Sequence, residues 1–265
     1  MPNKHPEVNS SLASETLRLG LRRVQTLVSQ GRLDEASFML EKAVASDPKN
    51  REVIIELASV RRGQGRLQDA IELASRALSM NKQDPTAIEL LLQLYLETGQ
   101  YEQVIDKGQK VLKRSPRNLF ARDLMGAAYL QLGKLDKALQ MTNELVHLDP
   151  LDPGNHFKRA VLFQQKGDIG KALREFSRVL DLDPDGEMGD EARDAITWLD
   201  SYQIRQILSL ALEDNLFRAK LLHDAENASV EKGFILSTGG MLTLRQIDFD
   251  RLLDPNLEAE PPTYH

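Results

Sequence analysis

Five glycines recur in this 265-residue chain at one constant interval of 34 residues. They are Gly31, Gly65, Gly99, Gly133 and Gly167. A fixed period between about 20 and 50 residues is typical of solenoids, in which similar supersecondary units stack on their neighbours. Such a chain presents an extended surface rather than one enclosed core. The interval therefore predicts a stack of repeated units and favours binding over catalysis.

The rest of each unit keeps the same register. The position five residues after each glycine holds a small or apolar residue: Ala36, Ala70, Val104, Ala138 and Ala172. The position seventeen residues after it holds Pro48, Pro116, Pro150 and Pro184, with Lys82 as the one exception. Proline cannot continue a helix and so ends the unit, whereas glycine suits a left-handed turn between two helices. Because no stretch alternates with period two over a strand length, the sequence predicts an all-α chain.

This pattern resembles the tetratricopeptide repeat, a helix–turn–helix unit of about 34 residues. Five units fit the register, at residues 17–50, 51–84, 85–118, 119–152 and 153–186. The fourth unit matches best, whereas Arg23 replaces an expected leucine in the first and Arg61 an expected aromatic residue in the second. The resemblance implies a superhelical solenoid whose first helices line a concave groove.

The segments outside the repeats complete the predicted domain organisation. Residues 1–16 are expected to be an N-terminal tail, and residues 187–200 a capping helix that continues the register and covers Trp198. Residues 201–254 lose the repeat and are predicted to form a small C-terminal helical module. Residues 255–265 are predicted to be a flexible tail.

The C-terminal module has a resemblance of its own. It is carried by Ala211-Leu212-Glu213-Asp214, Phe217-Arg218, Leu221-Leu222-His223-Asp224 and Gly233-Phe234-Ile235-Leu236-Ser237. These residues resemble the helical module of leader-peptide-like proteins, of the nitrile-hydratase-leader and ribosomal-peptide type. The Asp-Pro pair usual in that family is replaced here by Asp224-Ala225. The resemblance implies an accessory role in a peptide-modification or maturation system.

Charge is distributed unevenly along the chain. The chain carries a formal net charge of −6, but the five units (17–186) hold a net +3 and residues 187–265 a net −8. This asymmetry indicates a separate acidic module. It also argues against binding of nucleic acid by that module, because duplex recognition needs a basic surface.

The sequence lacks the residue patterns that enzymes and metal sites require. There is no cysteine, no pair of histidines at metal-ligand spacing and no phosphate-binding glycine loop. His147 and His156 are expected to be solvated loop residues. We therefore expect no enzymatic activity, no metal and no cofactor. No signal-peptide or membrane-spanning stretch is evident, so the predicted location is the cytoplasm without direct insertion into a membrane.

The family resemblance also implies a set of groove residues. They are Leu21, Gln25, Val28, Ile55, Arg62, Glu89, Gln93, Leu96, Phe120, Asp123, Leu130, Phe157, Val161 and Gln164. Phe120 and Phe157 are the large side chains of this set and are expected to be the anchors for a partner. The lysine and asparagine clamp that binds chaperone tails in this family is missing, because Leu21/Gln25, Ile55/Ser59 and Glu89/Gln93 stand at its positions.

Three functions are compatible with these patterns. The first is a non-enzymatic scaffold or adaptor that binds a peptide or an amphipathic helix in the concave groove. The second is an autoregulated scaffold, in which the acidic C-terminal module contacts the repeats and a partner displaces it. The third is an accessory protein that acts through the leader-like module.

Overall fold

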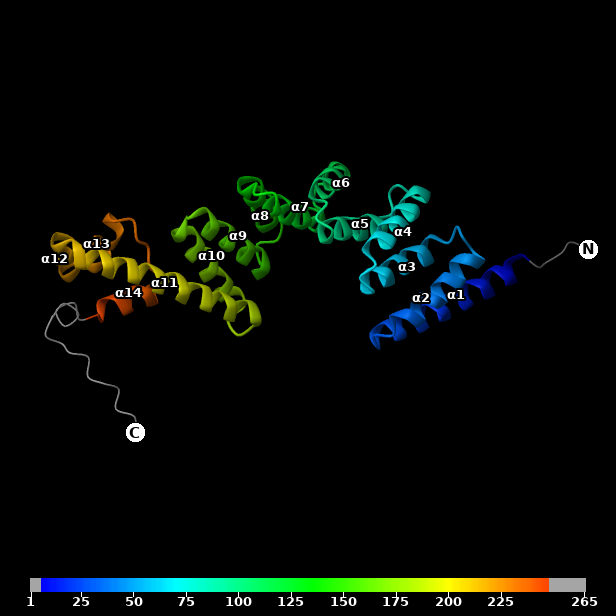
Figure 1. Ribbon diagram of the computed structural model, residues 1–265, viewed down its shortest axis with the longest axis horizontal. Helices are drawn as coiled ribbons and strands as arrows, with labels where there is room; N and C mark the ends of the chain where they lie inside the picture. Colours follow the sequence, from blue (N-terminus) through cyan, green and yellow to red (C-terminus); the bar gives the residue numbers. More distant parts are fainter. Residues whose placement is uncertain (1–5, 248–265) are drawn as a thin grey trace, which may run out of the picture. The chain divides into compact units, whose positions relative to one another are not determined.

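The computed structural model describes residues 6–247, and their side chains from Arg18 onward. The regular structure of this part is helical throughout (Figure 1). The helices are α1 (Pro6–Ser29), α2 (Leu33–Ser46), α3 (Arg51–Gly63), α4 (Leu67–Met80), α5 (Pro85–Glu97), α6 (Tyr101–Arg114), α7 (Leu119–Gln131), α8 (Leu135–Leu148), α9 (Pro153–Lys166), α10 (Ile169–Leu182), α11 (Glu187–Glu213), α12 (Asn215–His223), α13 (Ala225–Glu231) and α14 (Thr238–Arg245). They form two compact units, one ending at Met141 and one beginning at Thr142, so the division falls within α8.

Helix boundaries follow the register of the sequence. From α3 to α11 the odd-numbered helices begin 34 residues apart, and so do the even-numbered helices from α2 to α10. All five repeat glycines have positive φ angles, between 68° and 80°, in the turns that separate the two helices of a pair. A side chain with a Cβ is strained in this region, so glycine is the residue that the turn favours. The prediction of an all-α solenoid is confirmed.

An acceptor side chain caps the start of three of the first helices. Asn50, Asp84 and Asn118 precede α3, α5 and α7, and each accepts a hydrogen bond from the backbone N–H three residues later. Such N-caps satisfy a backbone donor that the helix leaves unpaired, and their loss costs about 1 kcal/mol. These caps set the position of every side chain in the first turn of the helix.

The N-terminal unit packs consecutive helices against one another. In addition, first helices of adjacent pairs contact each other, α3 with α5 and α5 with α7. Its main core contains fully buried alanines together with larger aliphatic side chains, among them Ala58, Ala70, Ala74, Leu91 and Leu94. The small residues allow helix axes to approach closely, as the sequence predicts.

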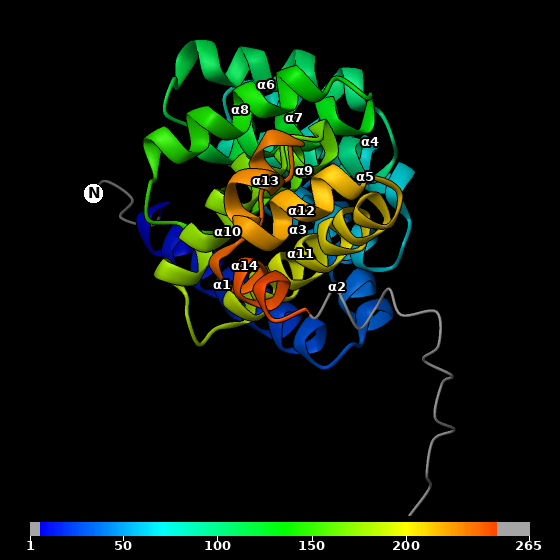
Figure 2. The ribbon, with the colours of Figure 1, turned by 90° about the vertical axis from the view of Figure 1, so that its left-hand side faces the viewer.

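The C-terminal unit is organised around one long helix. The first half of α11 packs on α10, where Phe176, Val179 and Leu199 are buried. The second half carries a separate core with Ile207 and Phe217, and α12 and α14 pack on this helix (Figure 2). The expected boundary between a capping helix and a module, at residue 200, is therefore not observed, because α11 continues unbroken to Glu213.

The C-terminal segment is tied to the end of the helical stack. Asp200 accepts a hydrogen bond from the backbone N–H of Ser237 over 2.8 Å. Ile235 covers Gly170 of α10 so closely that a Cβ on this glycine would lie 2.7 Å from its Cδ1. The residues after 200 thus pack on both α11 and α10, and they do not form an isolated module.

Two expectations concern the ends of the chain. Residues 6–16 belong to α1, which differs from the expected tail over 1–16. The expected tail at 255–265 lies outside the described residues.

Candidate functional site

The N-terminal unit contains a cavity of about 280 Å³ between α4, α5, α6 and α7. Its apolar wall is formed by Leu78, Pro85, Ile88, Leu92, Val111, Phe120 and Ala121. The side chains come from three consecutive helix pairs, so their arrangement depends on the stacking of the repeats. We call this feature the basic cavity, because most of its charged side chains are cationic.

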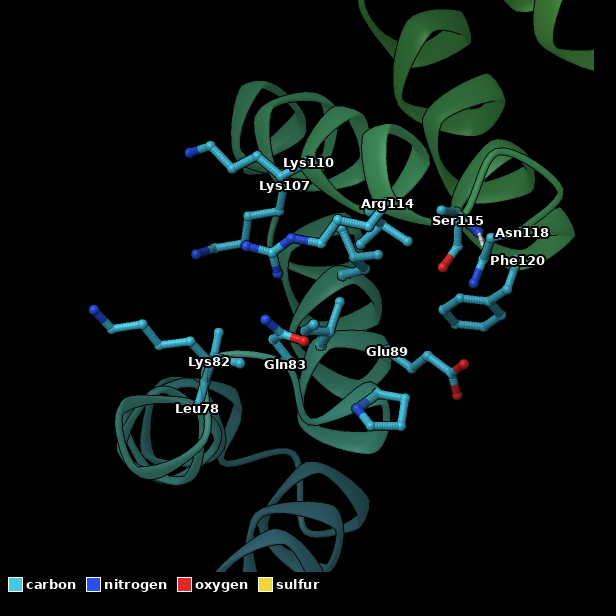
Figure 3. A pocket seen from close by; sticks show the side chains of 15 residues that line it. Leu78, Lys82, Gln83, Glu89, Lys107, Lys110, Arg114, Ser115, Asn118 and Phe120 are labelled. Carbon is cyan, nitrogen blue, oxygen red and sulfur yellow. Dashed lines mark hydrogen bonds between the residues drawn. The ribbon is translucent and has the colours of Figure 1, made fainter.

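Four cationic side chains line the basic cavity: Lys82, Lys107, Lys110 and Arg114. Glu89 is the one carboxylate among the described residues on its wall. Figure 3 shows the four cations on one side of the cavity, with Phe120 and Glu89 on the other. The site therefore combines an apolar surface with an excess of positive charge.

Two of the four cations have partners. Lys110 Nζ lies 2.6 Å from Oδ2 of Asp106, and this hydrogen bond lowers the pKa of the Asp106 carboxyl. Lys107 Nζ lies 5.7 Å from the centre of the Tyr95 ring. Within the described part of the chain, Lys82 and Arg114 form no ion pair. Their charges remain available to an anionic group from outside.

The local sequence explains how these cations come together. Lys107, Lys110 and Arg114 occur at i, i+3 and i+7 of α6, which places them on one face of the helix. Lys82 stands where the other units have proline. The cap at Asn118 positions Phe120 in the first turn of α7. The one irregular position of the repeat pattern thus contributes directly to the cavity.

A glycine brings α6 close to α7 at this site. A Cβ at Gly108 would lie 2.5 Å from Sδ of Met125. The backbone of α6 therefore lies so close to α7 that a larger residue at position 108 would require the Met125 side chain to move. This close approach holds the cationic face of α6 beside the apolar wall that Phe120 forms.

The structure brings together some of the predicted groove residues of the N-terminal unit. Glu89 and Phe120 both line the basic cavity. Arg62 donates a hydrogen bond to Gln93 Oε1 over 2.6 Å and another to Glu97 over 2.8 Å. Ile55 is only 8% exposed and belongs to the core, so its side chain presents little surface to a partner.

The remaining groove residues have varied environments. Gln25 and Val28 are exposed, whereas Leu21, Leu96, Asp123, Leu130, Phe157, Val161 and Gln164 are half-buried. Phe157 packs edge-on against Phe176, with ring centres 5.4 Å apart. Phe120 and Phe157 belong to different units.

The four cations of the cavity are absent from the predicted groove, because that groove includes first helices only. Lys107, Lys110 and Arg114 lie on the second helix of their pair, and Lys82 follows a second helix. The i, i+3, i+7 spacing of cations on α6 is a sequence signal for them, as is the exceptional residue at position 82.

Two further expectations are wrong. His156 is 5% exposed and is no solvated loop residue: Nδ1 lies 2.8 Å from Glu175 Oε2, and Nε2 lies 3.0 Å from the backbone oxygen of Pro150. Trp198 is 54% exposed and does not lie beneath the cap, because no helix covers its side of α11 in the described structure.

The leader-like segment has a structural role at its glycine pair. Gly240 is buried, and any Cβ there would collide with the carboxylate of Asp200. Its backbone N–H donates to Oγ of Ser237, the N-cap of α14, over 3.0 Å. The pair Gly239-Gly240 thus forms the first turn of a packed helix.

The described residues show neither a metal cluster nor a membrane span. Among them, no group of three or more histidine or acidic side chains could hold a metal ion. Within the same part of the chain, no helix is both long enough and apolar enough to cross a membrane.

Comparison with known proteins identifies the repeats. The family model of the tetratricopeptide repeat matches residues 21–88 and 124–187. The family model described as anaphase-promoting complex, cyclosome, subunit 3, matches residues 63–145. No curated protein matches the chain.

Solved structures give the same fold. The structure of MamA 41-end from Desulfovibrio magneticus RS-1 has a TM-score of 0.58 and 20% identity, and the match covers 64% of this chain and 96% of that one. YrrB, described as a TPR protein with an unusual peptide-binding site, has a TM-score of 0.53 and 19% identity, over 66% and 90% of the two chains. TTC0263, a TPR protein from Thermus thermophilus, has a TM-score of 0.54 and 20% identity, over 68% and 98%. The chain therefore contains tetratricopeptide repeats and has the fold of tetratricopeptide-repeat proteins.

Proposed function

We propose that this chain is a non-enzymatic adaptor that binds an acidic peptide segment of a partner protein at the basic cavity. Tetratricopeptide-repeat proteins typically mediate protein–protein interactions, and YrrB is described as having a peptide-binding site. The observation that carries the proposal is the juxtaposition of four cations with an apolar wall. We keep the sequence-based expectation that the protein acts in the cytoplasm.

The size of the cavity favours anchoring of a side chain. Pockets for small molecules commonly have about 300–1,000 Å³ and enclose most of the ligand. A cavity of about 280 Å³ on a stack of helices suits instead one apolar side chain of a longer segment. Phe120 and Ile88, which are partly exposed on the cavity wall, would contact that side chain, and the rest of the segment would lie across the rim.

The charges favour acidic residues next to the apolar anchor. Lys82 and Arg114 lack an ion pair among the described residues, so carboxylates of a partner would not have to displace an existing one. Positive rims also steer acidic segments toward the site and raise the rate of association at low salt. The proposed ligand is therefore an acidic segment with a single leucine or phenylalanine.

Three synthetic peptides of equal length test this proposal on the full chain. One is acidic with a central leucine, one is acidic with serine in its place, and one is basic with the central leucine. Fluorescence anisotropy of the labelled peptides should show saturable binding of the first and weaker binding of the second. An excess of the third, unlabelled, should not displace the first from the cavity. Affinity should fall as the salt concentration rises.

Variants then assign the binding to the cavity. Phe120→Ala should weaken the first peptide by about thirtyfold, because aromatic anchors contribute roughly 2 kcal/mol. Lys82→Ala combined with Arg114→Ala should weaken it and reduce the salt dependence. Lys49→Ala removes an exposed lysine outside the cavity and serves as the matched control. Binding that Phe120→Ala leaves unchanged in a folded protein would contradict the proposal.

A further inference from the structure

An aromatic pair lies exposed on α11. Trp198 and Tyr202 are 54% and 44% exposed, and their rings stack with centres 5.6 Å apart and planes 5° from parallel. The Tyr202 hydroxyl accepts a hydrogen bond from Gln206 over 3.0 Å. The ring faces that point away from the stack are not buried by other described residues of the C-terminal unit. Large exposed aromatic side chains are characteristic of interaction surfaces.

Trp198 continues a series of groove positions. The residues at this place of the earlier first helices are Val28, Arg62, Leu96, Leu130 and Gln164, each 34 residues after the one before. Trp198 follows Gln164 by the same interval. The register that defines the groove therefore extends into α11, at a position that the repeat pattern alone assigns to the cap.

Carboxylates share this face of the helix. Glu191 and Asp194 precede Trp198 by seven and four residues, which places all three along one side of α11. Both carboxylates are exposed, and across residues 18–247 neither forms an ion pair. By contrast, the neighbouring Asp190 is held by Arg193 at 2.5 Å. We call Glu191, Asp194, Trp198 and Tyr202 the acidic–aromatic stripe.

We infer that the acidic–aromatic stripe is a second docking surface and that it binds a lysine- or arginine-bearing segment of a partner protein. An ammonium or guanidinium group over the face of a tryptophan ring is attracted by the negative charge of that face. The stacked rings cover each other on one side only, so an outer face stays open. Glu191 and Asp194 supply the matching negative charge one and two turns away.

This surface is complementary to a different ligand from the one proposed for the basic cavity. The cavity selects negative charge, and the stripe selects positive charge. The two belong to different units, and each can be tested without the other. A chain with both surfaces would bind an acidic segment of one partner at the basic cavity and a basic segment of another partner at the acidic–aromatic stripe.

Trp198 is the one tryptophan of the sequence, so its fluorescence reports on the stripe directly. The full chain is titrated with a short arginine-rich peptide, with an acidic peptide of equal length and with a neutral one. The inference predicts a saturable change of tryptophan emission with the basic peptide alone, which weakens as salt is added. Equal responses to all three peptides, or no response to the basic one, would overturn it.

Variants separate the stripe from the rest of the surface. Glu191→Gln combined with Asp194→Asn should weaken the basic peptide about five- to tenfold, as should Tyr202→Ala. Trp198→Ala, followed by anisotropy of the labelled peptide, should weaken it further, and Trp198→Phe should restore part of the affinity. Glu213→Gln removes an exposed acid at the far end of α11 and is the matched control.

Phe120→Ala distinguishes this inference from the proposed function. It should weaken the acidic peptide about thirtyfold and leave the basic peptide unaffected. Circular dichroism and thermal unfolding confirm that each variant is folded, which is expected because the substituted side chains of the stripe are exposed. Unchanged affinity in folded stripe variants would show that the basic peptide binds elsewhere and would refute the inference.

Discussion

The side-chain amide of Gln203 bonds both backbone groups of Ile235: its Nε2 donates to the carbonyl oxygen over 2.7 Å, and its Oε1 accepts from the N–H over 2.9 Å. Gln203 is 4% exposed, so these groups have little access to water. The pair joins the middle of α11 to the segment between α13 and α14. This pair of hydrogen bonds is one reason why the chain after residue 200 packs against α11 and does not form an isolated module.

Gln203→Ala should therefore destabilise the C-terminal unit. The change leaves two part-buried backbone groups of Ile235 without their partner, and the cost for each stays below the roughly 1–3 kcal/mol of a fully buried group. Chemical denaturation should show the loss, and amide exchange should accelerate over residues 234–245. Gln206→Ala, at an exposed position of the same helix, is the control and should change little. Equal stability of the two variants would contradict this account of the junction.

Gly189→Ala should destabilise the junction between α10 and α11. Replacement of a helical glycine by alanine normally stabilises a helix by up to about 1 kcal/mol. At Gly189, however, the added Cβ would collide with the backbone oxygen of Asp183, which cannot rotate away. Thermal unfolding should show a lower midpoint. Gly20→Ala is the matched control, because a Cβ at Gly20 meets no atom within 4 Å, and it should raise stability slightly.

Glu56→Gln should stabilise the protein at neutral pH and have no effect at low pH. Burial raises the pKa of the Glu56 carboxyl, and the charge of Glu52 raises it further. The folded state then holds this proton more tightly than the unfolded chain does, so stability falls as pH rises from the ordinary pKa through the raised one. Glutamine does not ionise, so the Glu56→Gln variant does not lose stability in this way as the pH rises. The gain should stay below about 1 kcal/mol, because Glu56 is only half-buried and solvent screens its charge.

Denaturation at two pH values measures this effect. The difference between Glu56→Gln and the parent chain should be present at pH 7 and vanish below about pH 3, where the Glu56 carboxyl is protonated in both the folded and the unfolded chain. Glu72→Gln, at an exposed position of α4, is the comparison. A difference that persists unchanged at low pH would show that the substitution acts through packing instead.

The repeat register was predictable because its determinants are local. A glycine at positive φ, an N-cap and a residue that ends a helix each act within a few positions of the chain. The glycines of the turns and the starts of α3, α5, α7 and α9 therefore follow from the sequence alone. The prediction of a helix break at residue 200 was wrong for a related reason. The repeat register stops at this residue, but the sequence has no helix-ending residue there, so α11 continues.

The basic cavity and the exposure of Trp198 could not be derived in this way. Exposure of Trp198 depends on whether another helix covers that side of α11, and the 34-residue pattern carries no information about the helices after the last repeat. The cavity combines side chains from α4, α5, α6 and α7, and its four cations lie at positions that the family's first-helix groove omits. The burial of His156 was missed likewise, since its partner Glu175 lies on the next helix of the unit.

Amide hydrogen exchange of the full chain, with and without the acidic leucine peptide, tests the central claim most directly, since it locates the ligand without any substitution. The account predicts slower exchange in residues 78–92 and 107–121, which contribute the wall and the cations of the basic cavity. It predicts no change along the exposed face of α11. Protection confined to residues 187–202, or absent from α5, α6 and α7 at saturating peptide, would contradict it.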